Sequence, residues 1–84
     1  MPHLIVKLAK GRSDDVKQKL ADQLTIAMVD VLGIDANAVS IAMEDVPRED
    51  WMEQVYRPDI EAAADRLLKR PGYGPLASVS GNES

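Results

Sequence analysis

The sequence predicts an α/β domain in which two strands and the long helix between them form a βαβ unit, and a C-terminal helix follows. Three observations support this prediction: alternating apolar residues near the N-terminus, a long apolar stripe at helical spacing, and a second alternating stretch after a polar turn. Strands joined through a helix in this way are parallel, and the crossover is right-handed. The 84 residues make one domain at most, since domains typically hold ~100–150 residues.

The first strand and the long helix have the clearest patterns. Residues 3–8 alternate apolar and other side chains, which is typical of a strand. The helix is predicted over Asp14–Leu32, because Ser13 is a suitable N-cap, acidic residues fill the first turn, and Gly33 suits the position after the last turn. Its apolar residues fall within one ~120° stripe: Val16, Leu20, Leu24, Ala27, Met28 and Val31.

The second strand is predicted over residues 39–46, where apolar side chains alternate with small or polar ones. A two-stranded parallel sheet leaves faces and edges uncovered. We therefore expect a homodimer in which two copies join edge to edge in a four-stranded sheet, with the long helices on one side. Ile26 and Val29 lie off the helix stripe and are either singly exposed apolar residues or a second contact surface for a partner.

The C-terminal part is predicted to be helical before it becomes a tail. A short helical piece is expected over residues 47–55, and Pro58 suits the first position of a further helix that runs to residue 70, before a Pro-Gly pair. The last ten residues are mostly small and polar. We interpret residues 1–74 as a single domain and residues 75–84 as a loose C-terminal tail.

Charge and composition exclude several classes of function. Fourteen acidic against ten basic residues give a net charge of −4, which disfavours nucleic acid and the membrane surface as partners. No apolar run approaches the ~20 residues of a membrane span, and the N-terminus does not look like a leader, so we expect a cytoplasmic protein. The acidic residues between positions 44 and 53 match no ligand spacing, and we expect no metal.

Pro2 is the first candidate for chemistry. An aminopeptidase normally removes Met1 before so small a residue, which leaves a proline with a free secondary amine. The pKa of an α-amino group lies near ~8, and burial or nearby cations lower it, so this nitrogen can act as a base at neutral pH. Taken alone, a proline at this position also arises by chance.

Arg12 and Trp51 are candidate binding residues. Arg12 precedes the long helix, where free backbone N–H groups and its guanidinium attract a carboxylate, although a solvated loop arginine is the alternative. Trp51 is the only tryptophan. It either fills a small core or interface, or it forms the apolar wall of a dry pocket. His3 alternates with the core-facing residues and is interpreted as structural.

Pro2 and Arg12 flank the first strand, so at ~3.3 Å per residue they lie roughly 25–30 Å apart in one chain. They cannot meet in a monomer. If two copies pair antiparallel across a two-fold axis, the start of one chain faces the end of the other. We therefore expect a site built by two subunits.

Several motifs together resemble the 4-oxalocrotonate tautomerase family. They are an N-terminal proline opening a strand, an aromatic at Trp51, and the runs Gly11-Arg12-Ser13-Asp14 and Val39-Ser40-Ile41. The start Met1-Pro2-His3 and the ending Lys69-Arg70-Pro71-Gly72-Tyr73 are most similar to PptA-type tautomerases. The resemblance covers residues 2 to about 74.

The resemblance implies a tautomerase-like dimer of βαβ subunits that needs no metal or organic cofactor. It implies that Pro2 moves a proton between the oxygen and carbon of an enol, that Arg12 holds the substrate carboxylate, and that Trp51 is a hydrophobic wall. Members that act on dicarboxylates carry a second arginine at the position of Ser40. The expected substrates are therefore 2-oxo monocarboxylic acids of the phenylpyruvate kind, in their enol and keto forms.

Other functions remain open. The same Pro2 acting as a charged general acid would make a hydratase or dehalogenase of unsaturated acids, and as a nucleophile it would form an iminium with a carbonyl compound. A dimeric binding module of ferredoxin-like build, with no enzymatic activity, is the alternative outside enzymes. The N-terminal amine is dispensable only in that last case.

Overall fold

The computed structural model describes residues 1–77, which form two compact units, the first ending at Arg48 and the second beginning at Glu49. The first contains strand β1 (His3–Ala9), helix α1 (Asp14–Leu32), the short 3₁₀ turn η1 (Ala36–Ala38) and strand β2 (Ser40–Val46). Within the described residues, no helix is both long and apolar enough to cross a membrane.

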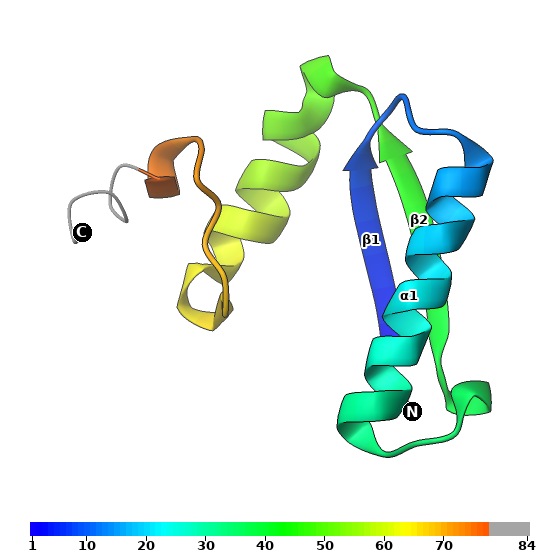
Figure 1. The fold of residues 1–84 in the computed structure, drawn as a ribbon. Coiled ribbons are helices and arrows are strands. Elements are labelled where there is room, and N and C mark those ends of the chain that lie inside the picture. The colour runs from blue at the N-terminus through cyan, green and yellow to red at the C-terminus, as the bar shows by residue number, and fades with distance from the viewer. Residues whose placement is uncertain (78–84) are drawn as a thin grey trace. The chain divides into compact units, whose positions relative to one another are not determined.

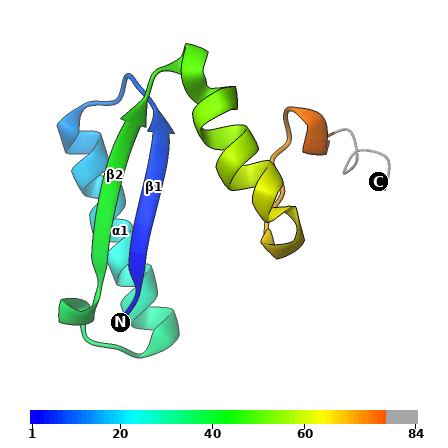
Figure 2. The ribbon, with the colours of Figure 1, turned by 180° about the vertical axis from the view of Figure 1, so that it is seen from behind.

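The first unit is the predicted βαβ unit, and the α/β fold class is confirmed. Strands β1 and β2 pair in parallel, in a register that runs from His3 opposite Ser40 to Ala9 opposite Val46. Helix α1 lies across one face of this two-stranded sheet (Figures 1 and 2). The four-stranded sheet of a dimer remains a prediction.

Both ends of α1 form as predicted. The Ser13 hydroxyl accepts a hydrogen bond from the Val16 N–H at 3.2 Å, which caps the first turn. At the other end Gly33 has φ of 65°, and its N–H donates to the Val29 carbonyl at 2.9 Å. A left-handed residue at this place ends the helix with its last carbonyls satisfied, and glycine adopts that conformation without strain.

The two faces of the sheet differ in cover. Partners in a parallel register share a face, so Val6 and Met43 lie toward α1 together with Asp45, whose carboxylate binds Lys17 of the helix. The opposite face carries His3 and Ser40 at one end. No described element of the first unit covers that opposite face (Figures 1 and 2).

The apolar stripe of α1 is only partly covered. No residue of the helix is fully buried. Leu20, Leu24 and Met28 are half-buried, whereas Val31 is 82% exposed. The chain alone therefore leaves apolar helix surface in water.

The second unit begins with a nearly continuous helical segment. The 3₁₀ turn η2 (Arg48–Asp50) begins at the last residue of the first unit, and the π-helix η3 (Met52–Ile60) and the 3₁₀ segment η4 (Glu61–Arg66) follow, with a kink at Ala63. The predicted helix start at Pro58 is wrong, because Pro58 lies inside η3. The wider π turn explains this: it relieves the clash between a proline ring and the carbonyl four residues back, so the helix continues through it.

The expected end of the last helix near residue 70 is also wrong. The helix ends at Arg66, and Leu67 is extended, with φ of −73° and ψ of 121°. The chain then turns back, since the Tyr56 hydroxyl donates to the Tyr73 carbonyl at 2.8 Å. A helix that continued to residue 70 would carry the following residues away from Tyr56.

Tyr56 and Val55 form the core of the second unit, at 0% and 4% exposure. The Leu76 N–H donates to the Tyr56 hydroxyl at 3.0 Å, so the chain beyond Tyr73 remains held at this core. Of the predicted loose tail, residues 78–84 lie outside the described residues. The single-domain interpretation of residues 1–74 remains a prediction.

Candidate functional site

Pro2 is held at the start of β1 through its carbonyl group. It is half-buried, and its carbonyl oxygen accepts a hydrogen bond from the Ser40 N–H at 3.2 Å. Met1 is fully exposed and within reach of an aminopeptidase. Because the hydrogen bond uses the carbonyl and not the nitrogen, removal of Met1 would free the Pro2 amine without releasing Pro2 from β2.

Ser40 also makes a side-chain contact beside Pro2. A hydrogen bond of 2.7 Å joins its hydroxyl to Nδ1 of His3. The sequence analysis missed this pair, and the signal that would have found it is the parallel register, which sets residues 3 and 40 opposite each other. His3, which was interpreted as structural, therefore has Ser40 as its hydrogen-bond partner. Ser40 presents a neutral group at this edge of the candidate site.

Arg12 lies at the other end of β1. Its Nη1 donates to the Ala9 carbonyl at 3.0 Å, which folds the side chain back over the end of the strand. The residue is exposed, and among residues 1–77 no carboxylate forms an ion pair with it. A guanidinium has five N–H donors, so this single bond leaves donors for a carboxylate ligand.

Lys17, near the same helix end, is in contrast committed to acidic partners. Its Nζ lies 2.8 Å from Oδ2 of Asp45 and 3.5 Å from Oδ1 of Asp14. The hydrogen bond to Asp45 is the main cause that raises the pKa of Lys17, against a smaller opposing effect of desolvation. Lys17 is therefore a poorer anchor for an anionic ligand than Arg12.

Pro2 and Arg12 do not come together within one chain. The seven residues of β1 separate them, and at ~3.3 Å per residue that is more than about 20 Å. Figure 1 shows the N-terminus at one end of β1 and the loop to α1 at the other. A site that uses both residues requires a second copy of the chain.

Trp51 belongs to the second unit, where it precedes η3. It is half-buried, and its indole Nε1–H donates to the Tyr73 hydroxyl at 2.8 Å. The sequence analysis used Tyr73 only as part of a resemblance. The contact was not predictable by spacing, because 22 residues and a reversal of the chain separate the two side chains.

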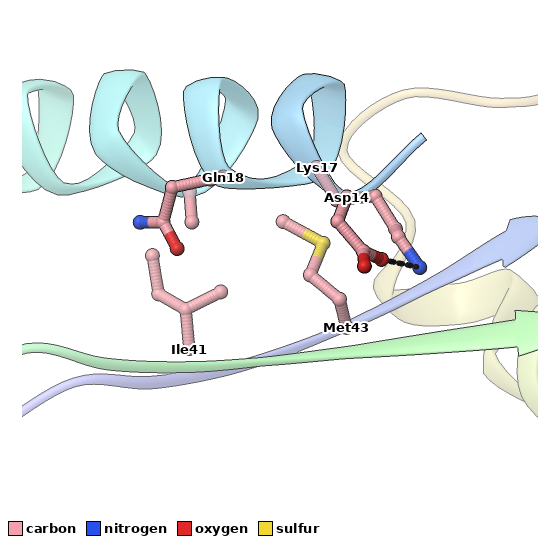
Figure 3. Close-up of a pocket in the computed structure, with 6 residues that line it drawn as sticks. Asp14, Lys17, Gln18, Ile41 and Met43 are labelled. Atoms are coloured by element: carbon pink, nitrogen blue, oxygen red, sulfur yellow. Dashed lines mark ion pairs between the residues drawn. The ribbon is translucent and has the colours of Figure 1, made fainter. Parts of the chain in front are cut away.

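An open cavity of about 410 Å³ lies between α1 and β2 (Figure 3). It contains none of the three predicted site residues. Asp14 and its ion-pair partner Lys17 form the charged end of the cavity, and Ile41 and Met43 form its floor. We interpret it as the gap beneath an incompletely covered helix, since it offers no uncommitted cation and no nucleophile.

Comparison with known proteins identifies a family. Residues 2–58 match the family model described as tautomerase enzyme. A probable tautomerase of Xylella fastidiosa is 68% identical over 78 residues, covering 93% of this chain and 95% of that protein. Tautomerase PptA of Cronobacter sakazakii is 38% identical over 74 residues, covering 87% and 97%. A solved 4-oxalocrotonate tautomerase isozyme of Methylibium petroleiphilum superposes with a TM-score of 0.58 at 30% identity, covering 60% of this chain and 81% of that one.

Proposed function

The chain belongs to the tautomerase family and is an isomerase, and from this premise we propose that it interconverts the enol and keto forms of 2-oxo monocarboxylic acids, with Pro2 as the general base and acid. One observation carries the proposal for Pro2. The residue is fixed through its carbonyl while the exposed Met1 precedes its nitrogen, so processing would produce an amine that is already in place.

The proposed reaction is a proton transfer between oxygen and carbon. The Pro2 nitrogen takes the proton of the enol hydroxyl, the C2–C3 double-bond electrons move to C3 as the carbonyl forms, and C3 receives a proton from the nitrogen. Atoms and electrons balance without a further reactant. General acid–base transfer of this kind typically accelerates a reaction by about 10²–10⁴-fold.

Arg12 and Trp51 take the binding roles in this proposal. Arg12 of a second subunit holds the substrate carboxylate, supported by its exposure and by the absence of an acidic partner among residues 1–77. Trp51 is the apolar wall of the pocket. A substrate with a single carboxylate is favoured because Ser40, hydrogen-bonded to His3, presents a neutral group.

A homodimer is part of the proposal. Part of the α1 stripe, including Val31, is exposed to water, and the two-stranded sheet has unpaired edges. Both surfaces would be stabilised by contact with a second copy. A C₂ arrangement supplies that contact and, when strands pair antiparallel across the axis, brings Pro2 of one copy toward Arg12 of the other.

The first test uses the N-terminus. Protein whose intact mass shows that Met1 is absent should ketonise enol-phenylpyruvate, followed by its ultraviolet absorbance, and N-terminal acetylation should lower kcat about 10²–10⁴-fold. Pro2→Ala keeps a primary amine and is the matched variant, with partial activity expected. Full activity of the acetylated protein would contradict the proposal.

The second test asks whether two subunits share a site. Arg12→Ala should raise KM, with Arg12→Lys intermediate because it keeps the charge and loses the planar fork. An N-acetylated preparation and Arg12→Ala, assayed at a substrate concentration low enough that each alone is nearly inactive, are then unfolded together and refolded as mixed dimers. A shared site predicts recovery of about a quarter of the wild-type activity, since half of the dimers are mixed and each holds one intact site. No recovery would overturn the shared site.

A further inference from the structure

The Trp51 indole is anchored by a side chain that the proposed function does not yet use. Its Nε1–H donates to the Tyr73 hydroxyl at 2.8 Å. Trp51 precedes η3, and the segment that carries Tyr73 returns to it after the helix has ended at Arg66. An indole has one hydrogen-bond donor, so this bond fixes the rotation of the ring about its own side-chain torsion.

Tyr73 is itself held from two sides by a buried residue. The Tyr56 hydroxyl donates to the Tyr73 carbonyl at 2.8 Å, and the two rings meet edge to face, with centroids 5.3 Å apart at 65°. Tyr56 is 0% exposed and also accepts a hydrogen bond from the Leu76 N–H at 3.0 Å. The anchor of Trp51 is therefore connected to the most buried side chain of the second unit.

Gly74 shows that this arrangement is tightly fitted. Its φ is 73°, and a Cβ atom at this position would lie 2.6 Å from Cζ of Tyr56. Only glycine combines that backbone conformation with so close an approach to the ring. The chain therefore passes directly over Tyr56 and fixes the backbone next to Tyr73.

We propose that Tyr73 is a positioning residue that orients Trp51 and thereby sets the preference of the enzyme for 2-oxo acids with an aryl side chain. This inference rests on the proposed function, in which Trp51 is the apolar wall of the pocket. A fixed indole presents one flat face against which an aryl ring stacks, whereas a freely rotating indole has to be ordered when the substrate binds. A small alkyl side chain gains little from either arrangement.

Two substitutions separate this role from a purely structural one. Tyr73→Phe keeps the ring contact with Tyr56 and the backbone carbonyl, and removes only the hydroxyl that binds Trp51. Tyr56→Phe is the matched control, because it removes two hydrogen bonds of the same core and leaves the Trp51–Tyr73 bond in place. Both variants lose one hydroxyl and keep all aromatic rings.

The readouts are the emission of the single tryptophan and a comparison of substrates. Tyr73→Phe should shift the emission of Trp51 and raise KM for enol-phenylpyruvate about 3–10-fold, the usual effect of losing one hydrogen bond, with kcat within twofold. KM for the enol of 2-oxobutanoate should change less than twofold. Tyr56→Phe should lower the unfolding midpoint and leave the ratio of the two KM values unchanged.

Binding of cinnamate, an unreactive aryl carboxylate, separates this inference from the proposed reaction. Quenching of Trp51 by cinnamate, weakened about 3–10-fold in Tyr73→Phe, would support the positioning role even if ketonisation were absent and the proposed reaction wrong. Unchanged emission in Tyr73→Phe, equal changes for aryl and alkyl substrates, or no quenching by cinnamate would each overturn the role of Tyr73.

Discussion

The two units of the chain hold their apolar side chains in opposite ways. In the first unit the 19-residue helix α1 has no fully buried residue, and Val31 is 82% exposed. In the second, Tyr56 of the shorter helix η3 is 0% exposed, and its hydroxyl makes hydrogen bonds to Tyr73 and Leu76. The first unit therefore leaves apolar helix surface uncovered, which the proposed dimer would cover, whereas the second contains a core residue whose hydroxyl is hydrogen-bonded within the unit.

Because of this difference, the two parts of the candidate site are held in place by different interactions. Pro2 and Arg12 lie at opposite ends of β1, in the unit whose long helix is only partly covered. Trp51 stands in the unit with its own core, tied to it through Tyr73. Association would therefore determine the catalytic geometry, and internal packing the orientation of the pocket wall.

Alanine substitutions at two glycines with a left-handed backbone conformation, one in each unit, test how tightly each unit is packed. Gly74→Ala adds backbone strain and a clash with Tyr56, and we expect it to lower the free energy of unfolding by roughly 2–5 kcal/mol. Gly33→Ala has a similar φ and no atom within 4 Å, so its cost should be only the strain, about 1–2 kcal/mol. Urea unfolding followed by circular dichroism and by Trp51 emission measures both, and equal losses would remove the contrast in packing.

A charge on the α1 stripe tests the dependence on a second copy. Val31→Glu should weaken the dimer about 10–100-fold, since burial of a valine side chain typically contributes ~1.5–3 kcal/mol and the carboxylate opposes it. Ile26→Glu is the matched control off the stripe, at 55% exposure. Sedimentation equilibrium measures both dissociation constants. An effect of Ile26→Glu alone would move the interface to the other side of the helix.

The ion pair between α1 and β2 should give the smallest effect. The pKa of Lys17 is raised in the folded protein, so the pair stabilises the fold below the ordinary pKa of lysine, near 10.5, and this contribution is lost as the pH rises through the raised value. Lys17→Met should be slightly less stable than the wild type at pH 8, and the difference should shrink as the pH rises past the raised pKa of Lys17. A stability difference that persists at high pH would show that the lysine stem, not its charge, stabilises the unit.

The βαβ unit was predictable because its signals are local. Alternation over β1, the apolar spacing of α1 and the cap residues Ser13 and Gly33 each act within a few positions, and the structure confirms the strand, the helix and both caps. Pro58 was misassigned because a proline suits a helix start, yet a π turn also accommodates it inside a helix. The choice between the two depends on the fold beyond that segment.

The site was less accessible to sequence reasoning than the fold. The resemblance to the tautomerase family is confirmed, but the roles of Pro2, Arg12 and Trp51 remain proposals. Two hydrogen-bond partners were missed. Ser40 lies 37 residues from His3 and is brought to it by the strand register. Tyr73 lies 22 residues from Trp51 and is brought to it by a reversal of the chain. Such contacts follow from the completed tertiary structure and leave no periodic signal.

The segment that returns to Tyr56 is synthesised later than the strand that carries Pro2, and this order has a consequence for incomplete chains. Translation makes β1 before it adds Tyr73, Gly74 and Leu76. A prematurely terminated product that stops before Tyr73 would still have β1 and the proposed secondary amine of Pro2, but its indole would lack the hydrogen bond to Tyr73. Such a fragment would lose discrimination between substrates before it lost the capacity for chemistry.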